Sequence, residues 1–230
     1  MTAAAEAVRR AAFFDLDETL VAHTTLLSFL RHHLAATGRP AGEYERVVAD
    51  IRQVGVRGGG REEANRAFYA RFAGESVADL AACGEEWFRR QLAAGGFFHE
   101  PGVSALDRHR AEGHRTVVVS GSFFACLDPV VRHLGADAAF GTEPVVEDGR
   151  MTGAIVEPMI GAAKGRLVAS WAAKHGVDAA DCFAYGDHAS DLELLRAVGH
   201  PVAVGEDPVL RAHVARNGGR TLPGVAPRPR

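Results

Sequence analysis

The sequence predicts an α/β fold, in which helices cover a parallel β-sheet and an all-helical unit is inserted near the start of the chain. From about residue 98 onward, short apolar or β-branched runs alternate with helix-like stretches, which is typical of a parallel sheet covered on both faces. Residues 22–97 instead hold four helix-like stretches in succession, with no strand between them. We therefore expect residues 1–21 and 98–230 to form the core, and residues 22–97 to form a helical cap over the strand ends.

The first predicted strand is Ala11–Phe14, an apolar run that leads into an acidic stretch. Asp15 and Asp17 follow it two residues apart, so they can converge on one site if the chain turns there. Their mutual repulsion is costly unless a cation or a shared proton offsets it. The same stretch also fits a plain strand followed by an acidic turn, because short motifs often occur without a function.

The helical unit is predicted from apolar residues at helical spacing. Such stripes occur in Leu26–Leu34, Tyr44–Val54, Ala64–Phe72 and Ser76–Phe88. Ser76, with Asp79 three residues on, gives the last stretch a start that resembles a capping box. The glycine triplet at 58–60 follows no strand, which favours a flexible helix connector over a phosphate-binding loop.

Predicted strands and helices alternate in the rest of the chain. Strands are expected at Arg115–Ser120, Ala138–Gly141, Cys182–Tyr185 and Pro201–Val204. Helices are expected at Pro101–Glu112, Phe123–Leu134 and Ala162–His175, and a last one begins at Asp207-Pro208. The Asp148-Gly149 pair predicts a small β-hairpin over residues 145–151. The proline-containing tail from about Thr221 is predicted to be disordered.

The composition excludes several classes of partner. The formal net charge is −3, so the chain lacks the basic footprint of a nucleic-acid-binding protein. No stretch approaches the roughly 18 apolar residues of a membrane span, and residues 1–10 lack the apolar core of a signal peptide. The three cysteines form no CxxC pair and are expected to be reduced thiols. We therefore expect a cytoplasmic monomer or homodimer that binds neither nucleic acid nor membranes.

Polar residues follow three of the predicted strands, at the edge where a parallel sheet binds its ligand. The set comprises four carboxylates, a hydroxyl beside a glycine, and a lysine at the start of a helix: Asp15, Asp17, Asp187, Asp191, Ser120, Gly121 and Lys164. Carboxylate oxygens suit a hard cation such as Mg²⁺. A hydroxyl, free backbone N–H groups and a lysine suit a phosphate group.

These stretches resemble, in order, the four motifs of the haloacid dehalogenase superfamily of phosphatases. They are DLDET at 15–19, VVVSG at 117–121, Lys164, and GDHASD at 186–191. The helical unit between the first two motifs and the segment EDGRMTG at 147–153 resemble the phosphoserine-phosphatase-like branch, subfamily IB. The resemblance implies a five-stranded, Rossmann-like core with a mobile helical cap of the C1 type.

The resemblance also implies a role for each residue. Asp15 would be the nucleophile that forms an aspartyl-phosphate, and Asp17 would be the general acid and then the general base. Ser120, Gly121 and Lys164 would bind the substrate phosphate. Mg²⁺ would be held by Asp15, the backbone carbonyl of Asp17, and Asp187, with Asp191 in support. The implied function is hydrolysis of a small-molecule phosphomonoester.

The sequence departs from phosphoserine phosphatases at two positions. His188 replaces a glycine after the fourth-motif aspartate, and Thr24 replaces the cap glutamate that accepts the substrate's ammonium group. A sugar, polyol or amino-alcohol phosphate is therefore expected to be a better substrate than L-phosphoserine. His188 is interpreted as a solvated loop residue, and His32 and His33, being adjacent on a helix, are not interpreted as a metal pair.

Three alternatives remain open at this stage. They are a phosphoserine phosphatase, a phosphotransferase or mutase that returns the phosphoryl group to an organic acceptor, and a non-catalytic regulatory binding protein on the same fold. A dehalogenase fits less well, because its chemistry needs neither the second aspartate nor the metal-binding set. The cap arginines, among them Arg31, Arg57 and Arg61, are interpreted as a mostly solvated face, from which one can reach the substrate.

Overall fold

The computed structural model describes residues 10–226, and the core of this part is a parallel β-sheet. Its strands are β1 (Ala11–Phe14), β2 (Arg115–Val119), β3 (Ala138–Phe140), β6 (Phe183–Gly186), β7 (His200–Val204) and β8 (Arg220–Leu222). They lie in the order β3-β2-β1-β6-β7-β8, and each neighbouring pair is parallel. The predicted α/β, Rossmann-like fold is thereby confirmed. The strand order changes direction at β1, which creates the crevice where such sheets bind ligands.

The sheet in the described residues has six strands, so the prediction of five strands is wrong. The additional strand is β8, which occupies part of the tail that was predicted to be disordered from Thr221 onward. Pairing with β7 holds it in place, and the N–H of Gly205 donates to the carbonyl of Leu222 at 3.0 Å. A three-residue edge strand with a proline directly after it carries almost no sequence signal of its own.

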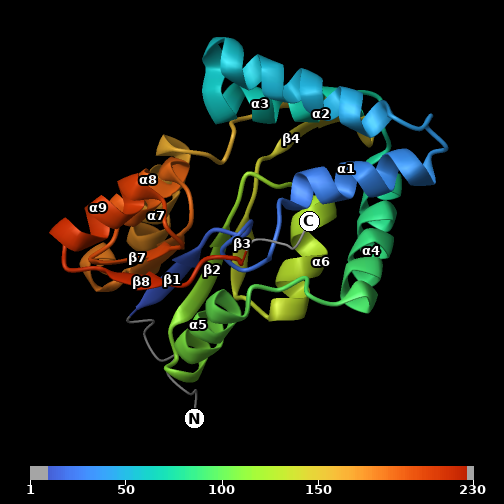
Figure 1. Ribbon diagram of the computed structural model, residues 1–230. Coiled ribbons are helices and arrows are strands. Elements are labelled where there is room, and N and C mark those ends of the chain that lie inside the picture. Colours follow the sequence, from blue (N-terminus) through green and yellow to red (C-terminus); the bar gives the residue numbers. More distant parts are fainter. Residues whose placement is uncertain (1–9, 227–230) are drawn as a thin grey trace.

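Helices cover both faces of the sheet because alternate residues of each strand point to opposite sides. Phe13 packs in one cluster with α7 (Ala162–His175), α8 (Leu192–Arg196) and α9 (Pro208–Arg216). Phe14 packs in the other cluster, which includes α5 (Glu100–Ala111) and α6 (Phe124–Leu134). Figure 1 shows α7–α9 on one side of the molecule and the N-terminal helices on the other.

The N-terminal helices are α1 (Thr25–Ala36), α2 (Glu43–Val54), α3 (Gly60–Tyr69) and α4 (Val77–Ala94), in the segment where four helices were predicted. The Ser76 side chain caps α4 by accepting a hydrogen bond from the N–H of Asp79. The glycine triplet joins α2 to α3 through a π-turn, Gly55–Gly59, and Gly58 has a φ of 143° that favours glycine. It is thus a helix connector, as predicted.

These helices share one apolar cluster with the sheet-containing part rather than forming a separate core. The ring of Phe123, just before α6, lies 5.5 Å from Phe29 and 5.7 Å from Phe72 between ring centroids. Gly84 of α4 is buried so closely against α6 that a Cβ there would lie 1.9 Å from the carbonyl oxygen of Ala125. The division into a core and a cap at residues 21/22 and 97/98 stays a prediction.

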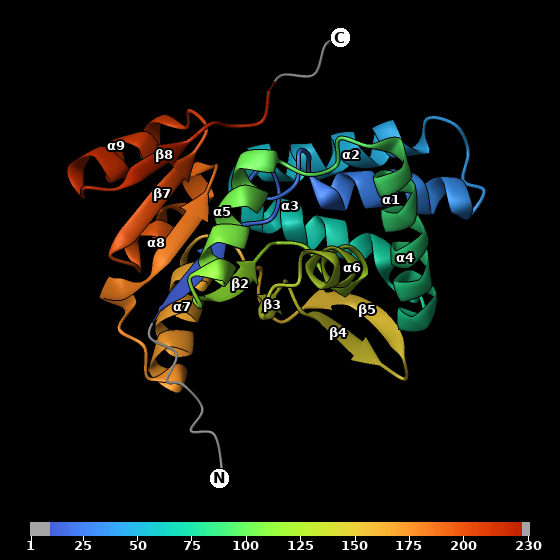
Figure 2. The same cartoon turned by 90° about the horizontal axis from the view of Figure 1, so that it is seen from below.

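The predicted hairpin is present as β4 (Pro144–Glu147) and β5 (Arg150–Ile155), an antiparallel pair outside the main sheet. Asp148 and Gly149 both have positive φ, 48° and 74°, as a tight turn of the I′ type requires. The hairpin is attached to the segment between α3 and α4, because Met151 exchanges backbone hydrogen bonds with Gly74 and Glu75. Figure 2 shows it below α4 and α6.

Three further expectations from the sequence concern a membrane span, the two ends of the chain and the adjacent histidines His32 and His33. No helix in residues 10–226 is long and apolar enough to cross a membrane. The signal-peptide prediction concerns residues 1–9, and part of the disordered-tail prediction concerns residues 227–230, which lie outside the described residues. His33 is buried whereas His32 is only half-buried, in agreement with the prediction that the two point to different faces.

Candidate active site

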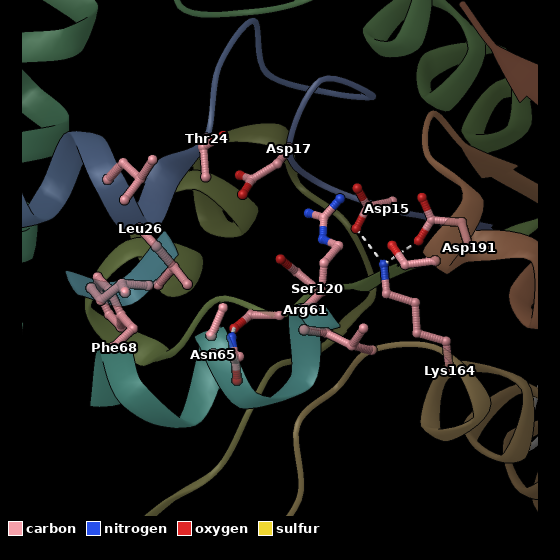
Figure 3. A pocket seen from close by; sticks show the side chains of 16 residues that line it. Asp15, Asp17, Thr24, Leu26, Arg61, Asn65, Phe68, Ser120, Lys164 and Asp191 are labelled. Carbon is pink, nitrogen blue, oxygen red and sulfur yellow. Dashed lines mark hydrogen bonds and ion pairs between the residues drawn. The ribbon is translucent and has the colours of Figure 1, made fainter. Parts of the chain in front are cut away.

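The polar residues singled out from the sequence meet at the carboxyl edge of the sheet (Figure 3). Asp15 follows β1 directly, Ser120 follows β2, and Asp187 follows β6. Lys164 lies in the first turn of α7, and Asp191 ends the short 3₁₀ turn before α8. The centre of the sheet thus collects side chains that are up to 176 positions apart in the chain, between Asp15 and Asp191.

Lys164 is the charged centre of this group. Its Nζ lies 2.5 Å from Asp15 Oδ1 and 2.7 Å from Asp191 Oδ1, and all three residues are less than 10% exposed. Burial alone would lower the pKa of Lys164, but the charges of Asp15 and Asp191 raise it well above its usual range. Lys164 is therefore a permanent cation at the site, and Asp191 holds it beside Asp15.

Asp17 is placed by a tight loop after β1. The loop turns at Glu18, which has a φ of 56°, and it is closed by hydrogen bonds from the N–H groups of Leu20 and Val21 to the carbonyl of Leu16. The Asp17 Oδ1 atom accepts a hydrogen bond of 2.9 Å from the N–H of Thr25, the first residue of α1. Burial, and then the charge of Asp15, raise the pKa of Asp17 to about 7.

Asp187 contributes a further carboxylate close to Asp15 and Asp191. Its Oδ1 accepts a hydrogen bond from the Thr19 hydroxyl at 3.3 Å. Burial, followed by the charges of Asp15 and Asp191, raises the pKa of Asp187 to about 9. The charge of Lys164 lowers this pKa, but it does not outweigh burial and the neighbouring carboxylates.

The donor set fits a divalent cation. One carboxylate oxygen from each of Asp15, Asp187 and Asp191 lies within 4.8 Å of the others. Hard oxygen donors of this kind suit Mg²⁺, and its charge would relieve the repulsion that raises the pKa of Asp187. The carboxylate of Asp17 is not in this cluster, because it is bonded to Thr25; a ligand from Asp17 would be its backbone carbonyl.

The end of β2 is tied to α3 by two hydrogen bonds. The carbonyl oxygen of Gly121 accepts from Asn65 Nδ2 at 3.0 Å and from the Tyr69 hydroxyl at 2.9 Å. Ser120 is buried, and its Oγ accepts from the N–H of Ser122 at 3.1 Å. The helix therefore fixes the backbone beside the predicted phosphate-binding residues.

A cavity of about 170 Å³ opens between these residues and the N-terminal helices. Its polar floor is formed by Asp15, Asp17, Ser120, Lys164 and Asp191. Its opposite wall is mostly apolar: Leu26, Leu27, Ile51, Ala64, Phe68 and Ile160. Arg61 of α3 and Thr24, just before α1, also line it, and Figure 3 shows the Arg61 side chain directed toward the aspartates. Among the described residues that line it, the only carboxylates are Asp15, Asp17 and Asp191.

Several of the lining residues resolve points that the sequence left open. Arg61 is the cap arginine that lines the cavity. Its charge lowers the pKa of Asp17, although burial and the charge of Asp15 raise that pKa by more. Thr24 lines the cavity as expected from its position, whereas Glu43 and Glu62, the cap carboxylates considered as substitutes for the missing glutamate, do not. His188 is exposed to solvent, as predicted, and its Nδ1 accepts from the N–H of Ser190 at 3.0 Å to cap the 3₁₀ turn.

Asn65, Tyr69 and Thr25 were missed as site residues from the sequence. Asn65 and Tyr69 lie on α3 close to the apolar stripe that was recognised through Ala64 and Phe68. A buried amide within such a stripe signals a specific hydrogen bond, since buried polar groups are almost always paired. Thr25 acts through its backbone N–H, which no side-chain motif reveals.

Comparison with known proteins agrees with this geometry. The family model of haloacid dehalogenase-like hydrolases matches residues 12–196. A Mycobacterium tuberculosis protein named as a phosphoserine phosphatase is 33% identical over 217 residues, which cover 90% of this chain and 68% of that protein. A probable phosphatase of the same species is 30% identical over 213 residues, covering 91% and 74%. A Bordetella pertussis protein of unknown function has a structure with a TM-score of 0.79 at 29% identity, covering 94% of this chain and 98% of that one.

The chain therefore belongs to the haloacid dehalogenase-like hydrolases. Within this family it is a phosphatase of the phosphoserine-phosphatase-like kind, as its four motifs predict. These relatives favour an enzyme over the non-catalytic binding protein that was considered as an alternative.

Proposed function

We propose that the protein is a Mg²⁺-dependent phosphatase that hydrolyses a small phosphomonoester through a phosphorylated Asp15. The observation that carries this proposal is the buried pairing of Asp15 with Lys164 at the floor of the cavity. A carboxylate held beside a permanent cation, at the end of a central strand, suits attack on an anionic phosphoryl group.

In the first step, a carboxylate oxygen of Asp15 forms a bond to phosphorus as the ester P–O bond breaks. The leaving oxygen takes the proton of Asp17. Because the pKa of Asp17 is raised to about 7, a large fraction of the protein carries this proton near neutral pH. The products of the step are the free alcohol and an aspartyl-phosphate on Asp15.

In the second step, Asp17 is ionised and removes a proton from a water molecule. The water oxygen bonds to phosphorus, and the bond between phosphorus and Asp15 breaks. Inorganic phosphate leaves, Asp15 is regenerated as a carboxylate, and Asp17 again holds a proton. The N–H of Thr25 orients the Asp17 carboxylate for both proton transfers.

Lys164, the Ser120 hydroxyl and the backbone N–H groups at Gly121 are proposed to bind the phosphoryl oxygens. Asp15, the Asp17 backbone carbonyl and Asp187 would hold the Mg²⁺ ion, which supplies electrostatic stabilisation of the phosphoryl charge when bound. Asp191 keeps Lys164 in position. Catalysis by these groups is mainly positioning plus electrostatics.

The cavity favours a sugar or polyol phosphate over L-phosphoserine as substrate. A free ammonium group needs an anionic acceptor, but outside Asp15, Asp17 and Asp191 the described lining residues offer only neutral acceptors, such as the Thr24 hydroxyl and the Asn65 amide. A charge-assisted hydrogen bond is about twice as strong as a neutral one. The competing proposal of a phosphoserine phosphatase is favoured by the name of a relative that is 33% identical to this chain.

Phosphate release across a panel of phosphomonoesters tests the proposal. With Mg²⁺, at least one small sugar or polyol phosphate should yield inorganic phosphate, and EDTA should stop the release. Adding an alcohol acceptor distinguishes a phosphotransferase, which would form a new ester in place of phosphate. Absence of phosphate release from every ester, in protein that is folded and supplied with Mg²⁺, would contradict the proposed reaction.

We also propose that the enzyme works in the cytoplasm. Cys83, Cys126 and Cys182 are all free thiols, which is typical of a reducing compartment.

A further inference from the structure

A second group of metal-binding side chains lies at the end of α5, away from the phosphatase site. His109 is in the last turn of the helix, and Glu112 and His114 follow in the turn that leads to β2. One ligand atom from each of the three residues lies within 4.8 Å of the others. We propose that His109, Glu112 and His114 form a binding site for a divalent transition-metal ion of the zinc type.

The distances within the group are close to those that such an ion requires. The Nδ1 atoms of His109 and His114 are 2.8 Å apart, and Glu112 Oε2 lies 3.5 Å from His114 Nδ1 and 4.0 Å from His109 Nδ1. A tetrahedral ion bound at about 2.0–2.1 Å needs its ligand atoms to be about 3.3 Å apart. Each of the three separations is thus within 1 Å of the required value, a change that small rotations of the exposed Glu112 and of His114 can provide.

The surroundings orient both imidazole rings for this role. His109 is 2% exposed, and its Nε2 is hydrogen-bonded to the Tyr185 hydroxyl at 2.8 Å, which leaves Nδ1 facing His114. His114 stacks on the ring of Phe183, with 5.6 Å between centroids. A partner on the second ring nitrogen is the usual arrangement for a metal-binding histidine, because it fixes the tautomer and the ring orientation.

The donor types indicate which metal fits. Two imidazole nitrogens and one carboxylate suit Zn²⁺, Co²⁺ or Ni²⁺, whereas Mg²⁺ prefers oxygen ligands alone. The partial negative charge at the C-terminal end of α5 favours a cation, while the positive charges of Arg108 and Arg10 nearby oppose it. Glu112 has a side chain that is 51% exposed, so an ion can enter from solvent and keep a water as fourth ligand.

The competing interpretation is a plain hydrogen bond between the two histidines, for which 2.8 Å is also suitable. The two interpretations differ in what Glu112 does. In a hydrogen-bonded pair Glu112 is dispensable, whereas in a metal site it supplies the only negative charge among the three ligands.

Calorimetric titration of the tag-free protein with Zn²⁺, in saturating Mg²⁺, decides between them. We expect one equivalent to bind and to raise the melting temperature, and we expect the same equivalent in Asp187→Asn, which disrupts the proposed catalytic metal site. Glu112→Gln should weaken binding by about tenfold or more, since even outer partners of a metal site are worth 10–100-fold. Asp107→Asn, an exposed carboxylate on the same helix, is the matched control and should bind as the parent does.

Two variants at the proposed ligands separate loss of metal binding from loss of folding. Glu112→Gln alters an exposed side chain, so it should fold and retain full Mg²⁺-dependent phosphatase activity. His114→Ala should abolish the Zn²⁺ equivalent, and its folding is checked by its melting temperature without metal. Absence of a Zn²⁺ equivalent in the parent protein, its loss in Asp187→Asn, or equal affinity in Glu112→Gln would each overturn the proposed site.

Discussion

The backbone N–H of Thr25 donates a hydrogen bond of 2.9 Å to Asp17 Oδ1. Thr25 is the first residue of α1, so the helix end that carries partial positive charge faces this carboxylate. The contact favours the ionised form of Asp17, whereas burial favours the protonated form and is the larger influence. Burial and the charge of Asp15 outweigh the bond from Thr25 and leave Asp17 with a pKa of about 7, which suits a group that must give and then accept a proton.

This balance predicts how Asp17→Asn will behave. The variant has no proton to give, so kcat should fall by about 10²–10⁴-fold for alkyl phosphates. The loss should be smaller for p-nitrophenyl phosphate, because its leaving group departs without protonation. The rate of alcohol release in the first turnover, measured with both substrates, checks this prediction, because Asp17 acts as a base only in the later hydrolysis of the aspartyl-phosphate. An equal loss for the two substrates would mean that Asp17 does not protonate the leaving group.

Arg61 is predicted to bind the substrate rather than to stabilise the fold. Arg61 lines the cavity and is exposed to solvent. A hydrogen bond to a charged group contributes about 1.5–3 kcal/mol, so its loss in Arg61→Gln should raise KM by about tenfold or more. The melting temperature should stay unchanged. Arg57→Gln is the matched control, because Arg57 is an exposed arginine of the same region outside the cavity. Equal kinetic effects of the two substitutions would remove Arg61 from the substrate site.

The raised pKa of Asp187 predicts that the stability of the protein depends on pH and on Mg²⁺. Its pKa rises from 3.8 to about 9 on folding without metal, so between these pH values the folded protein binds a proton that the unfolded chain has released. The contribution of Asp187 to stability is therefore lost as pH rises through this window. Melting temperatures in EDTA should fall from pH 5 to pH 9, and Mg²⁺ should restore more stability at the higher pH.

Asp187→Asn is the control for this link, because an amide does not titrate. The variant should lose most of the pH dependence in EDTA and most of the stabilisation by Mg²⁺. If the variant kept the full response to Mg²⁺, the ion would be bound elsewhere.

The neutral Thr24 side chain in the cavity predicts a preference for sugar or polyol phosphates over L-phosphoserine. The kcat/KM for L-phosphoserine should be lower than for the best sugar or polyol phosphate of the panel. Thr24→Glu would place a carboxylate in the cavity and should raise kcat/KM for L-phosphoserine by about tenfold, the worth of one hydrogen bond to a charged group. Thr24→Gln has nearly the same shape without the charge and should give no such gain. If L-phosphoserine is already the best substrate of the parent protein, the argument from Thr24 fails.

The positions whose convergence the sequence predicted are those whose signals are local. Asp15, Asp187 and Ser120 follow short apolar strands directly, and parallel strands place their carboxyl ends at one edge of the sheet. Lys164 was found through a motif, and its contact with Asp191 depends on how α7 and α8 pack together. Local pattern and sheet geometry together were sufficient to predict the floor of the site.

The features that were missed depend on contacts between distant parts of the chain. β8 exists because β7 offers it a partner, and its own three residues carry no strand pattern. Arg61 and Asn65 reach the site only because α3 docks on the end of β2. Asn65 and Gly121 are 56 positions apart in the chain, so no local pattern reveals this contact. The apolar cluster around Phe123, which the N-terminal helices share with the rest of the chain, was also not predicted. Replacing residues 22–97 by a linker would expose this buried surface, so point variants are the better test of the cap.

The central claim is that Asp15 becomes phosphorylated. The most direct measurement is acid quenching of the enzyme during turnover of a ³²P-labelled substrate with Mg²⁺, followed by peptide mapping of the label. The proposed mechanism predicts label on the peptide that contains Asp15, and no label in Asp15→Asn, a nearly isosteric variant that should stay folded. Rapid turnover with no protein-bound label at any quench time, or label on a peptide without Asp15, would contradict it.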